Sequence, residues 1–185
     1  MASEKMPARV ETERLVLRRP VALDAEAIFS RYASDPEVVR FVGFPAHRSV
    51  DDARAFVAIS DGQWERWPCG PFLIESRADG RLLGGIGLAY ETPRRAMTGY
   101  VLARDAWGLG YASEALRAIV ALADRFRVRR VYALCHTSHT PSARVLEKCG
   151  FALEGVLRAF AEFPNLRPGE PLDACCYSRI FEERG

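Results

Sequence analysis

The alternation of apolar and polar residues changes period near the middle of the chain. Before that point, apolar and β-branched runs are separated by turn residues, and Asp79-Gly80 is a hairpin signal between two of them. The strand-like runs are 71–76, 82–90 and 98–103. From residue 112 to 126, apolar residues instead recur at helical spacing. The pattern predicts an antiparallel meander followed by a long amphipathic helix.

Beyond that helix, strands and helices alternate. A β-branched and aromatic run predicts a strand over 131–135, Pro141 suits the first turn of the next helix, and Gly150 can end that helix in a left-handed conformation. The remaining predicted elements are strands at 15–18, 151–157 and 174–181, a loop at 163–171, a helix over 25–32 capped by Asp24, and a helix from the Ser49 capping box through Ile59. A meander followed by a βαβ unit predicts an α+β domain with a mixed sheet.

Composition narrows the protein class. With 185 residues and 49% hydrophobic content, the chain is long enough for one packed domain, expected over 11–185 after a polar, frayed segment at 1–10. A net charge of +2 without a basic patch argues against nucleic acid. No apolar run reaches the roughly 18 residues of a membrane span, and no signal peptide is expected. Five cysteines, two of them adjacent, favour reduced thiols in the cytoplasm.

A glycine-containing segment between a strand and a helix carries the strongest chemical signal. Gly108 and Gly110 allow a close backbone approach, and the helix start that follows favours an anion such as a pyrophosphate. A nucleotide-binding Walker loop would need Lys after Gly110, and a dinucleotide-binding loop would need a third glycine where Ser113 stands. An ordinary glycine-rich turn is the remaining alternative from this loop alone.

Three segments together carry a family resemblance. They are 99–102 (GYVL), 107–116 (WGLGYASEAL) and 142–151 (SARVLEKCGF). In combination they resemble the GNAT acetyltransferases, and with 11–18 (ETERLVLR) and 173–178 (DACCYS) they resemble the branch of ribosomal-protein N-terminal acetyltransferases. The resemblance runs from about Glu11 to Glu182. It implies a mixed, mostly antiparallel, splayed sheet flanked by helices, with acetyl-CoA as co-substrate and no metal.

The same resemblance assigns residues to acetyl-CoA. Backbone groups of the strand 100–102 would hold the pantetheine arm, and backbone N–H groups of 109–113 would hold the pyrophosphate. The residues assigned to the cofactor are Tyr100, Val101, Leu102, Trp107, Gly108, Leu109, Gly110, Tyr111, Ala112, Ser113, His139 and Arg144.

The sequence departs from the family pattern at the catalytic positions. Where relatives carry an Asn that helps to hold pantetheine, this chain has His139, which could donate a hydrogen bond, titrate or face solvent. Leu146 replaces the usual acidic Tyr, and Met97 replaces the usual basic Glu. Ser142 is left as the candidate donor to the leaving thiolate, or as a helix residue that bonds the local backbone. Ser142 and His139 are therefore the predicted catalytic residues.

The general base is the least determined part of the site. The candidates are Glu91, Glu154, Glu162, His136 and Tyr100. An α-amine has a pKa of about 8 and a lysine side chain one of about 10.4, so at pH 7.5 about one α-amine in four is neutral, against about one lysine in a thousand. A site without a strong base therefore favours a protein or peptide N-terminus. Direct attack by the amine needs no covalent intermediate, so Cys135 is interpreted as a buried apolar residue.

Several alternatives stay open at this point. The chain could bind acetyl-CoA without transferring it, acetylate a small amine such as an antibiotic, or keep the fold as an interaction domain. The amine is expected to be selected by 41–48, by 64–67 and by 163–171. The cluster of Cys135, His136 and His139 lacks the spacing of a closed zinc site. A homodimer is suggested by the resemblance alone.

Overall fold

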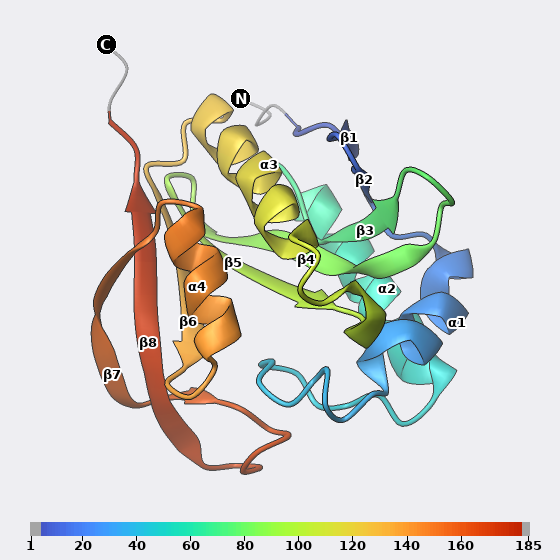
Figure 1. The fold of residues 1–185 in the computed structure, drawn as a ribbon. Coiled ribbons are helices and arrows are strands. Elements are labelled where there is room, and N and C mark those ends of the chain that lie inside the picture. Colours follow the sequence, from blue (N-terminus) through green and yellow to red (C-terminus); the bar gives the residue numbers. More distant parts are fainter. Residues whose placement is uncertain (1–4, 183–185) are drawn as a thin grey trace.

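The computed structural model describes residues 5–182, and its elements form one twisted sheet with helices on both faces (Figure 1). The strands are β1 (Arg9–Glu11), β2 (Leu15–Arg18), β3 (Phe72–Ser76), β4 (Leu82–Thr92), β5 (Arg95–Leu102), β6 (Arg130–His136), β7 (Ala152–Glu162) and β8 (Pro171–Ile180). The α-helices are α1 (Ala25–Ile28), α2 (Val50–Arg66), α3 (Tyr111–Arg125) and α4 (Thr140–Lys148).

The sheet is antiparallel except at one junction. Its strand order is β1-β2-β3-β4-β5-β6-β8-β7, and only β5 and β6 pair in parallel. That pairing covers three residues, Arg95–Met97 against Arg130–Tyr132, after which the two strands separate. The predicted mixed, mostly antiparallel, splayed sheet is therefore confirmed, and the gap opens beyond Met97.

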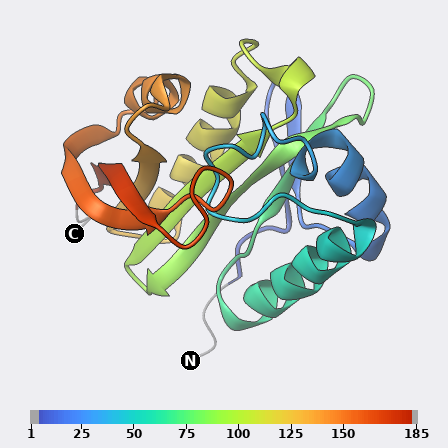
Figure 2. The ribbon, with the colours of Figure 1, turned by 90° about the horizontal axis from the view of Figure 1, so that it is seen from below.

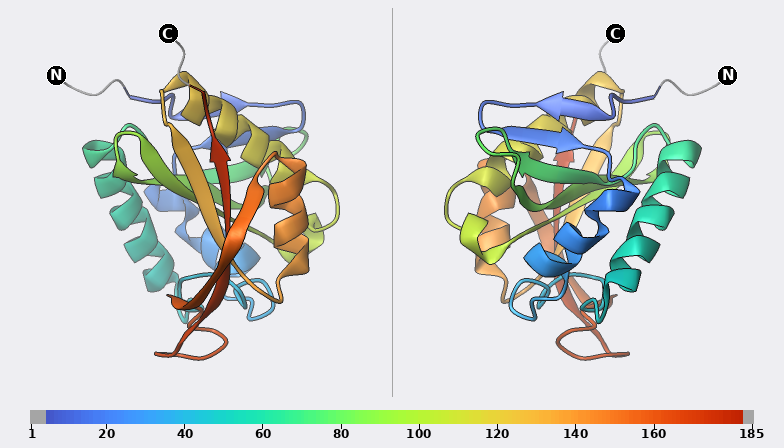
Figure 3. Two further views of the ribbon diagram at one scale, coloured as in Figure 1. Left: turned by 90° about the vertical axis from the view of Figure 1, so that its left-hand side faces the viewer. Right: turned by 90° about the vertical axis from the view of Figure 1, so that its right-hand side faces the viewer.

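Two apolar layers cover the two faces of this sheet. Seen along its edge, the sheet has α3 and α4 on one side and α1 and α2 on the other (Figure 3). Side chains of β3 alternate between the two layers. Phe72 and Ile74 pack in the core that includes α3, whereas Leu73 packs in the core that includes α1 and α2. The most buried face of α3 is the apolar stripe predicted from its helical spacing.

The N-terminal segment differs from its prediction as a frayed end over 1–10. Lys5 Nζ donates to three carbonyl oxygens at the end of α2 at 2.6–2.8 Å, and the N–H of Met6 donates to Pro68 O at 2.8 Å. Met6 is only 3% exposed, and residues 9–11 extend the sheet as β1. Burial of one apolar side chain and strand pairing order residues 5–10, while residues 1–4 lie outside the described part of the chain.

Two helix predictions also need correction. Asp24 does not cap α1 with its side chain, because the carboxylate binds the Arg18 guanidinium at 2.7 and 2.8 Å and accepts the Val21 N–H. The helix from the Ser49 capping box, in which Asp52 accepts the Ser49 N–H at 3.1 Å, continues beyond Ile59 to Arg66. Its last turns are held by tertiary contacts of a buried tryptophan, which local propensity could not indicate.

The register of β4 and β5 determines which backbone groups face the gap. The N–H of Ala103 donates to Leu83 O at 2.7 Å, and Val101 lies opposite Gly85. In an antiparallel pair such hydrogen-bonded positions alternate, so the backbone groups of Val101 point at β4 and those of Tyr100 and Leu102 point into the gap. Of the three residues 100–102 predicted to hold the pantetheine arm, only Tyr100 and Leu102 have backbone groups that face the gap.

Asn165 joins two loops at the lower end of the gap. Its Nδ2 donates to Val39 O at 2.7 Å and to Phe44 O at 2.8 Å, and its Oδ1 accepts the Ala46 N–H at 2.8 Å. Seen from below, the loop between β7 and β8 lies beside the segment that follows α1 (Figure 2). These are two of the three regions predicted to select the amine, and one side chain fixes them to each other.

Substitution Asn165→Ala should lower the free energy of unfolding by about 1–3 kcal/mol, because three backbone groups lose their partner. Urea denaturation followed by circular dichroism measures this change. Arg167→Ala in the same loop is the matched control, since its exposed pair with Glu170 should contribute less than about 0.5 kcal/mol. Equal stability of the two variants would contradict the role of Asn165 as a clamp.

Candidate functional site

A cleft lies between the start of α3 and α4. Its volume is about 290 Å³. It is lined by Leu102, Ala106, Gly108, Gly110, Tyr111, Ala112, Ser113, Pro141, Arg144, Val145 and Lys148. Seven of these were predicted from the sequence to bind acetyl-CoA, so the end of β5, the glycine segment and one residue of α4 meet at one cavity.

The glycine segment directs backbone N–H groups outward. Gly108 and Gly110 have positive φ angles of 74° and 82°, a conformation that costs other residues strain, and Gly110 is the residue that caps α3. Among the described residues no acceptor is found for the N–H groups of residues 108–113. Six such donors at the positive end of a 15-residue helix are suited to bind an anion.

Trp107 plays a different part from the one predicted. Its backbone N–H donates to Arg104 O at 3.2 Å and is not free for a phosphate. Its indole Nε1 donates to Leu102 O at 2.7 Å, while the ring is 47% exposed. Trp107 thus satisfies one of the two backbone carbonyls that the register of β5 leaves facing the gap.

Basic side chains from α4 complete the cleft. Arg144 was predicted, but Lys148 was missed, although the spacing of four residues places both on one face of a helix. Neither Leu109, which is 52% exposed, nor His139 lines this cavity. The cleft therefore combines two cations from α4 with the helix start of α3, which suits a ligand that carries several phosphate groups.

Tyr100 and Ser142 connect β5 to α4 by side-chain contact. The Tyr100 hydroxyl lies 2.9 Å from Ser142 Oγ and donates to Ser142 O at 3.0 Å. Burial is the largest cause that raises the pKa of Tyr100 above its ordinary value, so the phenol stays protonated at neutral pH. Leu146, at the usual position of the acid, is 1% exposed in the core. The only hydroxyls brought together here, within residues 5–182, are these two.

His139 belongs to an aromatic cluster at the C-terminal end of β6. Its ring stacks on Phe41 with centroids 4.6 Å apart, and His136 lies 5.3 Å from Phe41 and 5.0 Å from Phe163. Burial lowers the pKa of both histidines, and the charge of His136 lowers that of His139 further. Both imidazoles are therefore neutral at pH 7. Because His136 Nδ1 accepts the Ser138 N–H at 3.1 Å, the neutral ring carries its proton on Nε2.

Two of the three carboxylates proposed as bases, Glu91 and Glu154, are engaged elsewhere. Glu154 accepts from Arg130 and from Ser178, both at 2.6 Å, and these bonds lower its pKa to about 2. Glu91 accepts from Arg95 at 2.6 Å and from the Tyr132 hydroxyl. Met97, in the usual position of the base, is 36% exposed. Glu162 is exposed at the end of β7.

Two further predictions concern residues away from the cleft. Trp64 is 5% exposed, packs edge-on against Phe72 at 5.0 Å and donates to Pro71 O, so it cannot select a substrate. Cys135 is 4% exposed, and burial raises its pKa to about 11, as expected of a buried apolar residue. Over residues 5–182, no group of three metal-binding side chains is found, and no helix is long and apolar enough to cross a membrane.

The sheet is splayed, and a helix start suited to anions lies beside its gap. This arrangement is typical of acyl-CoA-dependent transferases. The chain matches the family described as acetyltransferase (GNAT) domain over residues 14–152. It belongs to the GNAT acetyltransferase family and is an acetyl-CoA-dependent N-acetyltransferase.

Relatives and solved structures agree with this assignment. The chain is 34% identical to the uncharacterized N-acetyltransferase YoaA of Bacillus subtilis over 92% of this chain and 96% of that protein. A GNAT-family acetyltransferase structure from Bacillus anthracis superposes with a TM-score of 0.81 at 27% identity, covering 93% of this chain and 98% of that one. RimL, a ribosomal L7/L12 α-N-protein acetyltransferase in complex with coenzyme A, gives a TM-score of 0.80 at 22% identity, covering 96% and 98%. At that identity the likeness to RimL shows the fold.

Substitution Gly110→Ala should weaken CoA binding about fivefold or more, because a left-handed alanine costs about 1 kcal/mol and would turn the free N–H groups away. Isothermal titration calorimetry with CoA measures the change. Gly62→Ala is the control, since Gly62 lies within α2 with nothing within 4 Å of an added Cβ. Unchanged affinity in Gly110→Ala would exclude this loop as the phosphate site.

Proposed function

We propose that the chain transfers the acetyl group of acetyl-CoA to an α-amine, such as the N-terminus of a peptide or protein. The observation that carries this proposal is the exposed Met97 at the position of the base, together with the pairing of Glu91 and Glu154, two of the three candidate carboxylates. An amine that is partly neutral at physiological pH needs little help to lose its proton. RimL, with the same fold, is an α-N-protein acetyltransferase, which is consistent with this acceptor class.

The residues around the gap support a direct reaction. The neutral amine attacks the thioester carbonyl, a C–N bond forms, the C–S bond breaks, and the amine proton passes to water. The outward backbone N–H of Tyr100 or of Leu102 is proposed to stabilise the oxyanion. No covalent intermediate is needed, and the protonated thiol of Cys135 takes no part.

Ser142 is proposed as the donor to the departing thiolate. Tyr100 donates to Ser142 O and lies against Ser142 Oγ, so it restricts the rotation of the serine hydroxyl. The neutral imidazole of His139, one helical turn earlier, is proposed to hold the acyl donor or the amine through a ring N–H. A reducing cytoplasm stays the proposed location, and the five free thiols are consistent with it. A homodimer stays a prediction.

Release of CoA thiol tests the acceptor class. With acetyl-CoA, peptides with free N-termini and blocked lysines should react at least about tenfold faster at pH 7.5 than peptides with blocked N-termini and free lysines. The rate should rise with pH towards about 8 and then level off, because it follows the neutral amine while both histidines remain neutral. Faster reaction of the lysine peptides, or of small amines such as antibiotics, would replace the α-amine proposal.

Substitution Ser142→Ala should lower kcat about a hundredfold and change the KM for acetyl-CoA little, because a hydrogen bond from the hydroxyl to the sulfur strengthens only as negative charge develops on the leaving thiolate. Steady-state kinetics with acetyl-CoA and with an acetyl thioester of a more acidic thiol measure the effect. The defect should shrink with the second donor, since a better leaving group needs less assistance. The same loss with both donors would assign Ser142 a structural role.

A further inference from the structure

Two sequence segments a hundred residues apart meet at one carboxylate. Glu114 lies in the first turn of α3, and its Oε1 accepts from Thr12 Oγ1 at 2.6 Å and from the Arg14 N–H at 2.8 Å. Its Oε2 accepts from Arg14 Nε at 2.7 Å. The turn between β1 and β2 is thereby fixed to the start of the helix that borders the cofactor cleft.

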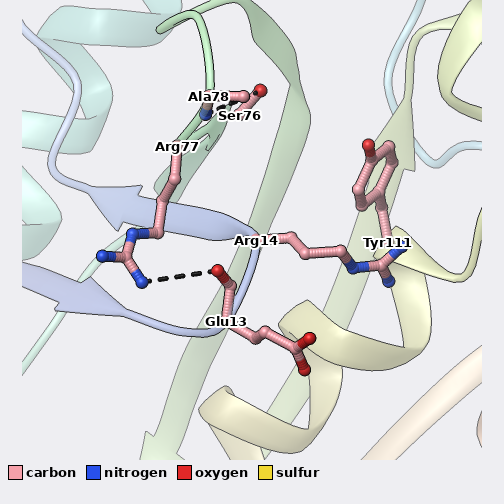
Figure 4. Close-up of a pocket in the computed structure, with 6 residues that line it drawn as sticks. All are labelled: Glu13, Arg14, Ser76, Arg77, Ala78 and Tyr111. Carbon is pink, nitrogen blue, oxygen red and sulfur yellow. Dashed lines mark hydrogen bonds between the residues drawn. The ribbon is translucent and has the colours of Figure 1, made fainter.

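The same arginine continues into the glycine segment. Arg14 Nη1 donates to Leu109 O at 2.9 Å, and the guanidinium carbon lies 4.6 Å from the centroid of the Tyr111 ring. The close-up of the neighbouring surface pocket shows Arg14 extended towards Tyr111, while Arg77 on its other side donates to Glu13 O (Figure 4). A Cβ added to Gly110 would lie 3.4 Å from Arg14 Nη2. Arg14 therefore contacts Leu109 and Tyr111, on the two sides of Gly110.

The negative charge of Glu114 lies near the proposed diphosphate site, and its ion pair with Arg14 offsets that charge. Burial alone would raise its pKa, but hydrogen bonds from Thr12 and Arg14 hold the pKa below its ordinary value, so the carboxylate is charged at pH 7. Its side chain is 15% exposed and lies one turn after Gly110, where the free N–H groups would receive a diphosphate. An unpaired carboxylate one helical turn from these N–H groups would repel the diphosphate.

We propose that Arg14 is a positioning residue for the diphosphate of the acyl donor. By holding Leu109 O and stacking on Tyr111, it keeps the N–H groups of the loop turned outward, and by pairing with Glu114 it offsets the negative charge of that carboxylate beside them. This inference rests on the proposed use of acetyl-CoA and is independent of which amine accepts the acetyl group.

The experiment compares two acyl donors in two variants. Acetyl-CoA carries the diphosphate, whereas acetyl-pantetheine lacks it. Arg14→Met should raise the KM for acetyl-CoA and the Kd for CoA about tenfold, leave kcat within about twofold, and leave the KM for acetyl-pantetheine unchanged. Adding Glu114→Gln to Arg14→Met should recover part of the affinity for CoA, because the repelling charge is removed.

Further variants separate positioning from support of the fold. Arg14→Lys, which keeps the charge but cannot bond Glu114 and Leu109 O together, should bind CoA with intermediate affinity. Arg9→Met, which removes an exposed pair with Glu11 in the same hairpin, should behave as the parent protein. Equal losses with both acyl donors, or no recovery in the double variant, would overturn the proposal. Failure of the parent protein to bind CoA would instead overturn the proposed function, and this inference with it.

Discussion

The separation of β5 from β6 is the constraint on which the rest of the site depends. After three paired residues the strands part, and each leaves backbone groups without a strand partner in the middle of the sheet. Unpaired backbone groups at a buried edge are costly unless something satisfies them. The Trp107 indole donates to one of these carbonyls, that of Leu102. The other outward groups, the N–H and C=O of Tyr100 and the N–H of Leu102, are placed to pair with the amides of a ligand.

The helix start of α3 supplies the second set of backbone donors beside the gap. The N–H groups of residues 108–113 are preorganised by two left-handed glycines, and Arg144 and Lys148 stand opposite them on α4. Because these donors are mostly backbone atoms, side-chain identity in the loop matters less than its conformation. A guanidinium from the first hairpin of the chain restrains that conformation.

Sequence reasoning succeeded where structure is determined locally. The strand at 15–18, the left-handed Gly150 and the Asp52 half of the capping box are as predicted, since each depends on a few neighbouring residues. It failed where distant contacts decide, as in the last turns of α2, which Trp64 anchors, and in the pairing of Asp24 with Arg18. In the site, the glycine motif was predictable, whereas the contact of Arg14 with Glu114 and that of Tyr100 with Ser142 need the fold.

The two sides of the gap therefore differ in how they can change. The cofactor side consists mostly of backbone groups and a helix start, whose conformation depends on the two glycines and on the contacts of Arg14. The acceptor side brings together side chains from separate segments, with Phe41, His136, His139 and Phe163 in ring contact and Asn165 holding two loops together. A substitution of Phe41 or Phe163 would alter the proposed acceptor surface without changing the glycine segment or the start of α3. Under the proposed transfer to an α-amine, the pKa of the acceptor becomes part of its recognition, because Met97 stands at the position of the base and only amines that are neutral at the working pH can attack.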